Sequence, residues 1–277
     1  MVNSFGQRLL ETFVKRGQLC IGLDPSSDQL QKWGLPFSES GAEEFCNQIM
    51  GESEGNVGIL KPQVAFFEQF GSKGFAVLER VLSRAKGMGY LVIADAKRGD
   101  IGSTMAGYAS GWLSSTAPFV VDALTVSPYL GAKSLEDTIL LAQENRKGLF
   151  LLAATSNSEA KGLQSSIGNG GQSVAKSISS FAVEHNESHL GSIGVVVGAK
   201  IKIEEFGIAK QELENTPILT PGFGAQGARL ADGKRLFGEL SKNVIFNVSR
   251  AIAGDSPSGL QDRVLSAKRE LEIGLSN

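Results

Sequence analysis

The sequence predicts a single (β/α)8 barrel, or TIM barrel, spanning residues 1–277. Short apolar runs recur at near strand length, several are rich in Val and Ile, and the segments between them are long enough for helices. Runs this uniformly apolar are typical of strands buried on both faces of a parallel sheet. Eight such runs are present: Leu19–Leu23, Val57–Leu60, Tyr90–Ala94, Phe119–Leu124, Leu149–Ala154, Ile193–Val197, Pro217–Leu219 and Val244–Val248. A doubly wound open sheet is the alternative architecture.

The segments between the runs fit this alternation. The helical period is clearest where Phe75, Leu78, Val81 and Leu82 recur at three- and four-residue steps with charged residues between them. No linker rich in Pro, Gly or Ser divides the chain, so we predict one domain. The segment from Gly162 to Gly171 is rich in Gly, Ser and Asn, and we predict that it is a mobile loop after the fifth strand.

Composition excludes several classes of protein. The net charge of -2 gives no basic surplus for binding nucleic acid. No run of eighteen apolar residues is present, so we expect no membrane span. Residues 1–17 lack the continuous apolar segment of a secretion signal, which predicts a cytoplasmic location. Cys20 and Cys46 lack the spacing of a metal site and are expected to be free, buried thiols.

Charged residues gather at the ends of the first three predicted strands. Asp24 follows the first strand, Lys61 follows the second, and Asp95 and Lys97 follow the third. Residues two apart in an extended chain share a face, so Asp95 and Lys97 should point the same way while Ala96 points away. Each residue alone is explained by an ion pair at the barrel rim. Together, at the carboxyl ends of consecutive barrel strands, they predict an active site.

A glycine-rich segment follows the seventh predicted strand. Gly222 to Gly227 matches the GxGxxG pattern of dinucleotide-binding proteins, which makes an NAD-dependent dehydrogenase one alternative function. That pattern belongs after the first strand of its fold, however, and here it follows the seventh. We therefore interpret it as a phosphate-binding loop, with Arg250 after the eighth strand as the charged partner of the phosphate.

The segment Asp95–Thr104, with the sequence DAKRGDIGST, resembles the DxKxxD signature of orotidine 5'-phosphate decarboxylases. It is most similar to the bacterial branch with the DAKRGDIG form, and the similarity extends along the whole chain. The resemblance implies an enzyme of de novo pyrimidine biosynthesis that decarboxylates orotidine 5'-monophosphate to UMP without a metal or other cofactor. It also implies a homodimer with shared active sites, and no nucleic-acid or membrane partner.

The resemblance further implies a role for each residue of the site. Lys97 would stabilise the C6 carbanion and protonate it, Asp95 would lie near the departing carboxylate, and Lys61 would help to keep Lys97 charged. Gly99 permits a sharp turn that presents Asp100 separately. The implied catalytic residues are Lys61, Asp95, Lys97 and Asp100, and the implied substrate-binding residues are Asp24, Ile101, Thr104, Ser156, Pro221, Gln226, Ser249 and Arg250.

The substrate-binding residues divide among the parts of the substrate. Asp24, with Lys61, would reach the ribose hydroxyls, and Gln226 and Arg250 would bind the phosphate. Members of the family commonly carry glycine where Ser249 stands. For the pyrimidine contact Ser156 is the first choice and its neighbour Thr155 the alternative. The neighbouring subunit would contribute Asp100, Ile101 and Thr104.

Two further functions and a zinc site are alternatives to this interpretation. Magnesium-dependent phosphosugar enzymes share DxKxxD but carry an acidic residue where Lys61 stands, and a lysine repels a divalent cation. A non-catalytic nucleotide-binding barrel is the other alternative, and the intact charged array argues against it. His185 and His189, four residues apart, have a spacing that could hold zinc on a helix. They precede the sixth strand, at the end of the barrel opposite the site, so we predict no metal site there.

Overall fold

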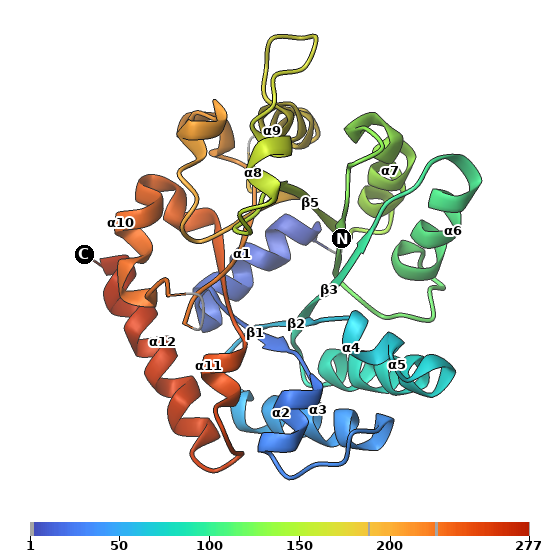
Figure 1. Ribbon diagram of the computed structural model, residues 1–277, viewed down its shortest axis with the longest axis vertical. Helices are drawn as coiled ribbons and strands as arrows, with labels where there is room; N and C mark the ends of the chain where they lie inside the picture. The colour runs from blue at the N-terminus through green and yellow to red at the C-terminus, as the bar shows by residue number, and fades with distance from the viewer. Residues whose placement is uncertain (1–2, 188, 225–226, 277) are drawn as a thin grey trace.

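The computed structural model describes residues 3–187, 189–224 and 227–276. Within them eight parallel strands form a closed barrel in the order β1 to β8 (Figure 1). The strands are β1 Leu19–Leu23, β2 Ile59–Pro62, β3 Leu91–Arg98, β4 Ala123–Val126, β5 Gly148–Ala154, β6 Ile193–Val197, β7 Ile218–Pro221 and β8 Val244–Val248. Because β8 pairs with β1, the sheet has no edge. This confirms the predicted TIM barrel and rules out the doubly wound alternative.

The predicted strand positions are right, but two kinds of boundary are wrong. The fourth strand begins at Ala123, because Phe119 leaves the sheet and stacks on Trp112 at a ring-centroid distance of 4.2 Å. The second and third strands continue further than predicted, so that Lys61 lies within β2 and Asp95 and Lys97 lie within β3. Polar side chains do not end these strands, because the backbone pairing continues past them, as between Gly22 and Lys61.

Helices surround the barrel in Figure 1. They are α1 Phe5–Arg16, α2 Ser27–Lys32, α3 Glu39–Ser53, α4 Ala65–Glu68, α5 Gly71–Gly87, α6 Gly102–Leu113, α7 Glu136–Glu144, α8 Ala160–Gln164, α9 Val174–Glu184, α10 Gly233–Phe237, α11 Arg250–Ala253 and α12 Leu260–Ser276. The predicted helix around Leu78 is α5. Between β6 and β7 the described chain forms two 3-10 helices, Ile203–Phe206 and Lys210–Leu213, where a regular barrel has an α-helix.

The segment from Gly162 to Gly171 is more regular than a simple loop. It begins inside α8, and Ile167 forms an antiparallel bridge with Ser173. The hydroxyls of Ser165 and Ser166 donate to the carbonyls of Lys161 and Gly162, at 2.7 and 2.6 Å, and so satisfy the end of the helix. The serine side chains of this segment therefore stabilise the end of a short helix.

Helix α1 closes the end of the barrel opposite the predicted site. It begins with a capping box between Ser4 and Gln7. Its Phe5 and Leu9 are fully buried among residues that fill the barrel interior, and the Phe5 ring packs edge-on against Phe150, with centroids 5.9 Å apart. A second, larger core fills the layer between strands and helices.

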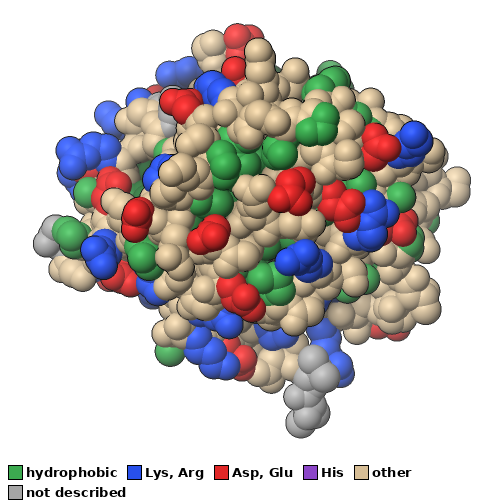
Figure 2. Space-filling model, turned by 90° about the horizontal axis from the view of Figure 1, so that it is seen from below, with side chains coloured by type: hydrophobic (Ala, Val, Ile, Leu, Met, Phe, Trp, Pro, Cys, Tyr) green, Lys and Arg blue, Asp and Glu red, His purple; other side chains and the backbone are tan. Residues whose placement is uncertain are grey.

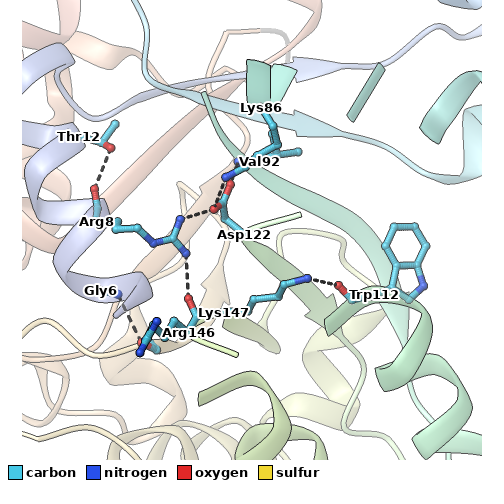
Figure 3. Close-up of polar contacts among 10 residues, drawn as sticks. Gly6, Arg8, Thr12, Lys86, Val92, Trp112, Asp122, Arg146 and Lys147 are labelled. Atoms are coloured by element: carbon cyan, nitrogen blue, oxygen red, sulfur yellow. Dashed lines mark hydrogen bonds and ion pairs between the residues drawn. The ribbon is translucent and has the colours of Figure 1, made fainter. Parts of the chain in front are cut away.

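A charged cluster fixes α1 to the same end of the barrel (Figure 3). The buried carboxylate of Asp122, just before β4, accepts from Arg8 and from Lys86 Nζ (2.7 Å) through Oδ1, and from the backbone of Val92 (2.9 Å) through Oδ2. Arg8 also donates to the carbonyl of Arg146 at 2.8 Å. Since the buried carboxylate is paired with two cations and a backbone N–H at the end of the barrel away from the cavity, we assign this cluster to stability.

The two cysteines and the surface behave as composition predicts. Cys20 and Cys46 are free and buried, and burial raises the pKa of the Cys20 thiol to about 12. Figure 2 shows Lys and Arg side chains interspersed with Asp and Glu over one face, without a single basic patch. None of the helices in the described ranges has both the length and the apolar character needed to cross a bilayer.

Candidate active site

A cavity of about 470 Å³ opens at the carboxyl ends of the strands, the end at which TIM barrels carry their active sites. Residues from almost every strand end contribute to its wall. The described lining residues are Asp24, Lys61, Gln63, Asp95, Lys97, Thr125, Leu152, Thr155, Ser156, Asn157, Val196, Leu219, Pro221, Gly222, Phe223, Asn247, Ser249 and Arg250. The predicted residues Asp24, Lys61, Asp95, Lys97, Ser156, Pro221, Ser249 and Arg250 are therefore brought together in one cavity.

Three charged side chains form a continuous array on the β2 and β3 side of this cavity. Lys61 Nζ lies 2.8 Å from Asp95 Oδ2, and Lys97 Nζ lies 2.6 Å from Asp95 Oδ1. The side chains of Lys61 and Asp95 are only 5% and 12% exposed, whereas that of Lys97 is 44% exposed. The array thus presents the Lys97 ammonium to the cavity and keeps the other two charges behind it.

Two neutral side chains complete the coordination of Asp95. Thr125 Oγ1 donates to Oδ1 at 3.0 Å. The amide of Gln63 satisfies both of its neighbours when its nitrogen is assigned toward Asp95, so that it donates to Oδ2 at 2.5 Å and accepts from Lys97 Nζ at 3.2 Å. A carboxylate has about four lone-pair sites, and four protein donors therefore saturate Asp95. Asp95 is therefore held in one orientation as a negative charge.

Electrostatics keeps these groups ionised despite their burial. Burial alone would lower the pKa of Lys61, but the carboxylates of Asp95 and Asp24 outweigh it, and the pKa is raised above its usual value. Burial alone would raise the pKa of Asp95, but Lys61 and Lys97 outweigh it, and the pKa is held well below its usual range. Asp24 lines the cavity, and its Oδ1 is buried without a hydrogen-bond partner among the described residues.

The backbone at Lys97 departs from the extended form that the sequence predicted. Its φ is +49°, a left-handed conformation that costs a residue other than glycine about 1–3 kcal/mol. The pairing of β3 with β4 shifts register between Ala94 and Arg98. The prediction that Asp95 and Lys97 point together is right, as is the outward direction of Ala96, which packs against the outer core.

Gly99 is required for a different reason from the predicted one. Its backbone φ is not positive, so no special turn depends on it. A Cβ at this position would lie 2.2 Å from the carbonyl oxygen of Ser127. The close approach of two strand ends therefore excludes a side chain there.

The predicted phosphate end lies across the cavity from β3. Pro221 ends β7, Gly222 follows it, and Arg250 begins α11 after β8 with its side chain exposed to the cavity. Gln226 lies outside the described residues. Ser249 packs so closely on β1 that a Cβ at Gly22 would lie 1.9 Å from its Oγ. Strand β1 carries glycine at this point to leave room for the serine.

Helix α11 is held from behind by side chains that bind its carbonyl groups. Arg263 donates to the carbonyls of Ile252 (2.7 Å) and Ala253 (2.8 Å), and also to two carbonyls of the following loop. Gln29 donates to the carbonyl of Gly254 at 2.6 Å. Four-residue helices have no internal stability of their own, so these contacts fix the position of Arg250.

The third side of the cavity combines polar and apolar groups. Thr155, Ser156 and Asn157 follow β5, and the Thr155 hydroxyl bonds Asn157 Oδ1 at 2.8 Å and the Gln164 amide at 3.0 Å. Leu152, Val196 and Leu219 form an apolar floor beside them. This side suits a flat ring with polar edges, and it places both Ser156 and Thr155 within the lining.

Three predicted residues do not reach the cavity of their own barrel. Asp100, Ile101 and Thr104 are absent from the described lining. Asp100 Oδ1 accepts from the backbone of Ile101 at 2.8 Å, Ile101 is 59% exposed at the start of α6, and Thr104 is exposed in the first turn. Ile101 and Thr104 are thus exposed at the surface, and Asp100 is half-buried.

Some polar residues of the lining were not predicted, among them Gln63 and Asn247. Gln63 lies two residues after Lys61, and the period of two that joined Asp95 to Lys97 would have joined this pair as well. Asn247 lies in the strongly apolar β8 and accepts from Cys20 Sγ at 3.5 Å. A lone polar residue in a buried strand is itself a signal of a polar cavity.

Neither histidine is among the described residues that line the cavity. His185 ends α9, where Nδ1 lies 2.8 Å from the carbonyl of Phe181 and Nε2 lies 3.0 Å from Glu136. Among the residues that the structure covers, no group of three or more His, Cys, Asp or Glu side chains is arranged to hold a metal ion.

Comparison with known proteins agrees with this geometry. The sequence model of the orotidine 5'-phosphate decarboxylase / HUMPS family matches residues 17–259. Orotidine 5'-phosphate decarboxylases from Streptomyces coelicolor and Corynebacterium efficiens are 44% and 45% identical, over 97% and 93% of this chain and 96% and 92% of their own lengths. A Streptomyces avermitilis crystal structure, described as a candidate for the same enzyme, superimposes with a TM-score of 0.94 at 41% identity, covering 100% of this chain and 97% of that one. The chain belongs to the orotidine 5'-phosphate decarboxylase family.

Proposed function

We propose that this protein decarboxylates orotidine 5'-monophosphate to UMP, a step of de novo pyrimidine biosynthesis, without a metal or organic cofactor. The observation that carries the proposal is the array of Lys61, Asp95 and Lys97, in which two ammonium groups lie 2.8 and 2.6 Å from one saturated carboxylate. Family membership and 44% identity to a named decarboxylase support the same reaction.

The chemistry needs a fixed positive charge beside the reacting carbon. Breaking the bond between C6 and the carboxylate leaves an electron pair in an sp2 orbital that no ring group delocalises. Enzymes acting on slow reactions supply on the order of 20 kcal/mol of transition-state stabilisation. Charges that are already oriented in a site of low dielectric supply most of such stabilisation, because they need no reorganisation during the reaction.

Lys97 is the residue that we assign to this task. Carbon dioxide leaves with the C6–carboxylate bond broken, the electron pair remains on C6, and a proton from Lys97 Nζ forms the new C6–H bond. Solvent then returns a proton to Lys97. Its 44% exposure lets it reach both substrate and water. Asp95, held ionised beside it, disfavours the substrate carboxylate and keeps Lys97 oriented.

The remaining residues of the cavity bind the parts of the substrate that do not react. Arg250 binds the phosphate by a bidentate contact, assisted by Gln226 and by the backbone around Pro221 and Ser249. Asp24, with its unpartnered Oδ1, binds ribose hydroxyls together with Lys61. Ser156 contacts the pyrimidine edge. Binding energy from these distant groups positions C6 against Lys97.

The ammonium of Lys61 also favours a reaction without metal. Its positive charge lies 2.8 Å from Asp95 Oδ2 and would repel a divalent cation at this carboxylate. An oxygen-ligand site for magnesium needs several carboxylate or carbonyl oxygens around the ion. Here the oxygens of Asp95 are already bound by protein donors.

The proposal includes a homodimer with shared sites. Asp100 of the partner subunit completes the array next to Lys97, and Ile101 and Thr104 of the partner subunit line the same site. The support is that none of the three is among the described residues that line their own cavity, and that Ile101 and Thr104 are exposed. Tyr129 (77%) and Leu130 (53%) are also exposed, and exposed apolar side chains of this kind favour an interface.

The test follows the ultraviolet absorbance of orotidine 5'-monophosphate with the purified full-length chain, with and without excess EDTA. We expect conversion to UMP at the same rate in both. Conversion that EDTA abolishes would point to the magnesium-dependent alternative, and no conversion by folded, dimeric protein would overturn the proposed activity.

A further inference from the structure

One hydroxyl joins the backbone of Lys97 to the carboxylate of Asp95. Thr125, in β4, accepts from the Lys97 backbone N–H at 2.9 Å and donates to Asp95 Oδ1 at 3.0 Å. Its side chain borders the cavity, and the residue is only 1% exposed. A hydroxyl has one proton, so donation to Asp95 fixes its rotation and turns a lone pair toward Lys97.

The Lys97 backbone depends on this contact. Its φ of +49° places it outside the regular strand, and the paired residues of β3 and β4 are Ala94 with Leu124 and then Arg98 with Val126. The ladder therefore passes over Lys97, and the Thr125 side chain supplies the acceptor that a neighbouring backbone would have supplied. A buried N–H group that lacks an acceptor lowers the stability of the folded state.

We propose that Thr125 is a positioning residue for the reaction, which acts by holding the left-handed backbone of Lys97 and the carboxylate of Asp95 in register. It does not touch the reacting carbon. Without the hydroxyl, the Lys97 N–H loses its acceptor and Asp95 Oδ1 keeps only one of its two donors. The Lys97 ammonium would then no longer be held in line with C6. This inference rests on the proposed decarboxylation.

The test compares three variants with the wild type. Thr125→Val keeps the shape and the strand propensity of the residue but removes the hydroxyl, and Thr125→Ser keeps the hydroxyl. Thr220→Val is the matched control, since Thr220 is a fully buried threonine of β7 whose hydroxyl has no partner among the described residues. Each is assayed for kcat and for UMP affinity, and hydrogen exchange of the Lys97 amide is followed by NMR.

We expect Thr125→Val to lower kcat by about 10- to 100-fold, the effect of a small misplacement of a catalytic group, with UMP affinity changed less than threefold. Thr125→Ser should recover most of kcat, and Thr220→Val should resemble the wild type. The Lys97 amide should exchange faster in Thr125→Val only.

Several results would overturn the inference. These are a kcat for Thr125→Val no lower than that of Thr220→Val, a Ser variant no better than the Val variant, or unchanged protection of the Lys97 amide. If Thr125→Val does not fold, Thr125→Ser is compared with Thr125→Cys, which replaces the hydroxyl with a thiol. A wild type that is inactive on orotidine 5'-monophosphate would refute the proposed function, and the exchange measurement would still decide whether Thr125 holds Lys97.

Discussion

Lys61 and Asp95 form an ion pair at 2.8 Å on the wall of the barrel, with their side chains only 5% and 12% exposed. The pair joins β2 to β3. On the cavity side, Lys97 Nζ lies 2.6 Å from Oδ1 of the same carboxylate. Removing one partner of a buried pair leaves the other charge uncompensated, which makes the array a determinant of stability as well as of chemistry.

Stability should depend on pH through Asp95. Its folded pKa is lowered, because Lys61 and Lys97 outweigh the effect of burial. A carboxyl with a lowered folded pKa stabilises the fold above its unfolded pKa and loses that contribution as the pH falls toward the folded pKa. We expect Asp95→Asn to lower the free energy of unfolding by about 3 kcal/mol from pH 5 to pH 8, and by progressively less below about pH 4.

Urea unfolding at each pH measures this difference. The raised pKa of Lys61 keeps its charge constant over the same range, so it adds no slope. Asp28→Asn is the control, because Asp28 is 73% exposed in its surface pair with Lys32 and should change stability little at any pH. A difference that grows as the pH falls would contradict the lowered pKa of Asp95.

Lys97→Ala should abolish turnover while leaving UMP binding measurable. The variant removes both the positive charge beside C6 and the proton donor, and we expect kcat to fall by at least about 1000-fold. Steady-state kinetics and calorimetric titration with UMP measure the two effects. Lys133→Ala, at an exposed lysine outside the cavity lining, should keep full activity. Near-normal turnover by Lys97→Ala would end this assignment.

Arg250→Ala should weaken phosphorylated ligands and leave the bare nucleoside almost unaffected. The loss of charge-assisted hydrogen bonds predicts an affinity for UMP about 10- to 100-fold lower, with the affinity for uridine within about twofold. Arg229→Ala, at an exposed arginine outside the cavity lining, is the matched control. Equal weakening of both ligands would show that Arg250 does not bind the phosphate.

Mixing two inactive variants should restore activity if the subunits share their sites. In a dimer of one Asp95→Ala chain and one Asp100→Ala chain, one site loses both carboxylates and the other keeps both. We expect up to about half of the wild-type activity per heterodimer, measured after co-refolding and separation by affinity tags. Heterodimers that form but stay inactive would count against a contribution of Asp100 across the interface.

The sequence was sufficient for the fold class. Apolar runs such as Ile193–Val197 identify buried strands by composition alone, and their regular alternation with long connections predicts a barrel. Boundaries were less certain, because a strand ends where its pairing ends. Phenylalanine is common in strands, yet the ring of Phe119 stacks on Trp112 outside the sheet. No local pattern contains that information.

The candidate site was likewise predictable from the sequence only in part. The DAK segment and Lys61 were visible because charges at the ends of apolar strands are unusual, and the period of two places Asp95 and Lys97 together. The hydrogen bonds of Thr125 to the Lys97 backbone and to Asp95 join residues 28 and 30 positions apart. They depend on the register shift between β3 and β4.

The sequence by itself therefore determined the barrel and the kinds of charge at its mouth, because both follow from local composition and period. Only the tertiary structure decided that Asp95 is saturated by four donors and that Lys97 is left-handed. It likewise decided that Arg263 binds the carbonyl groups of α11 and that Asp100 is absent from the described lining of its own cavity. The contacts of Asp95 depend on strand pairing, which brings Lys61, Thr125 and Asp95 from three neighbouring strands within hydrogen-bond range.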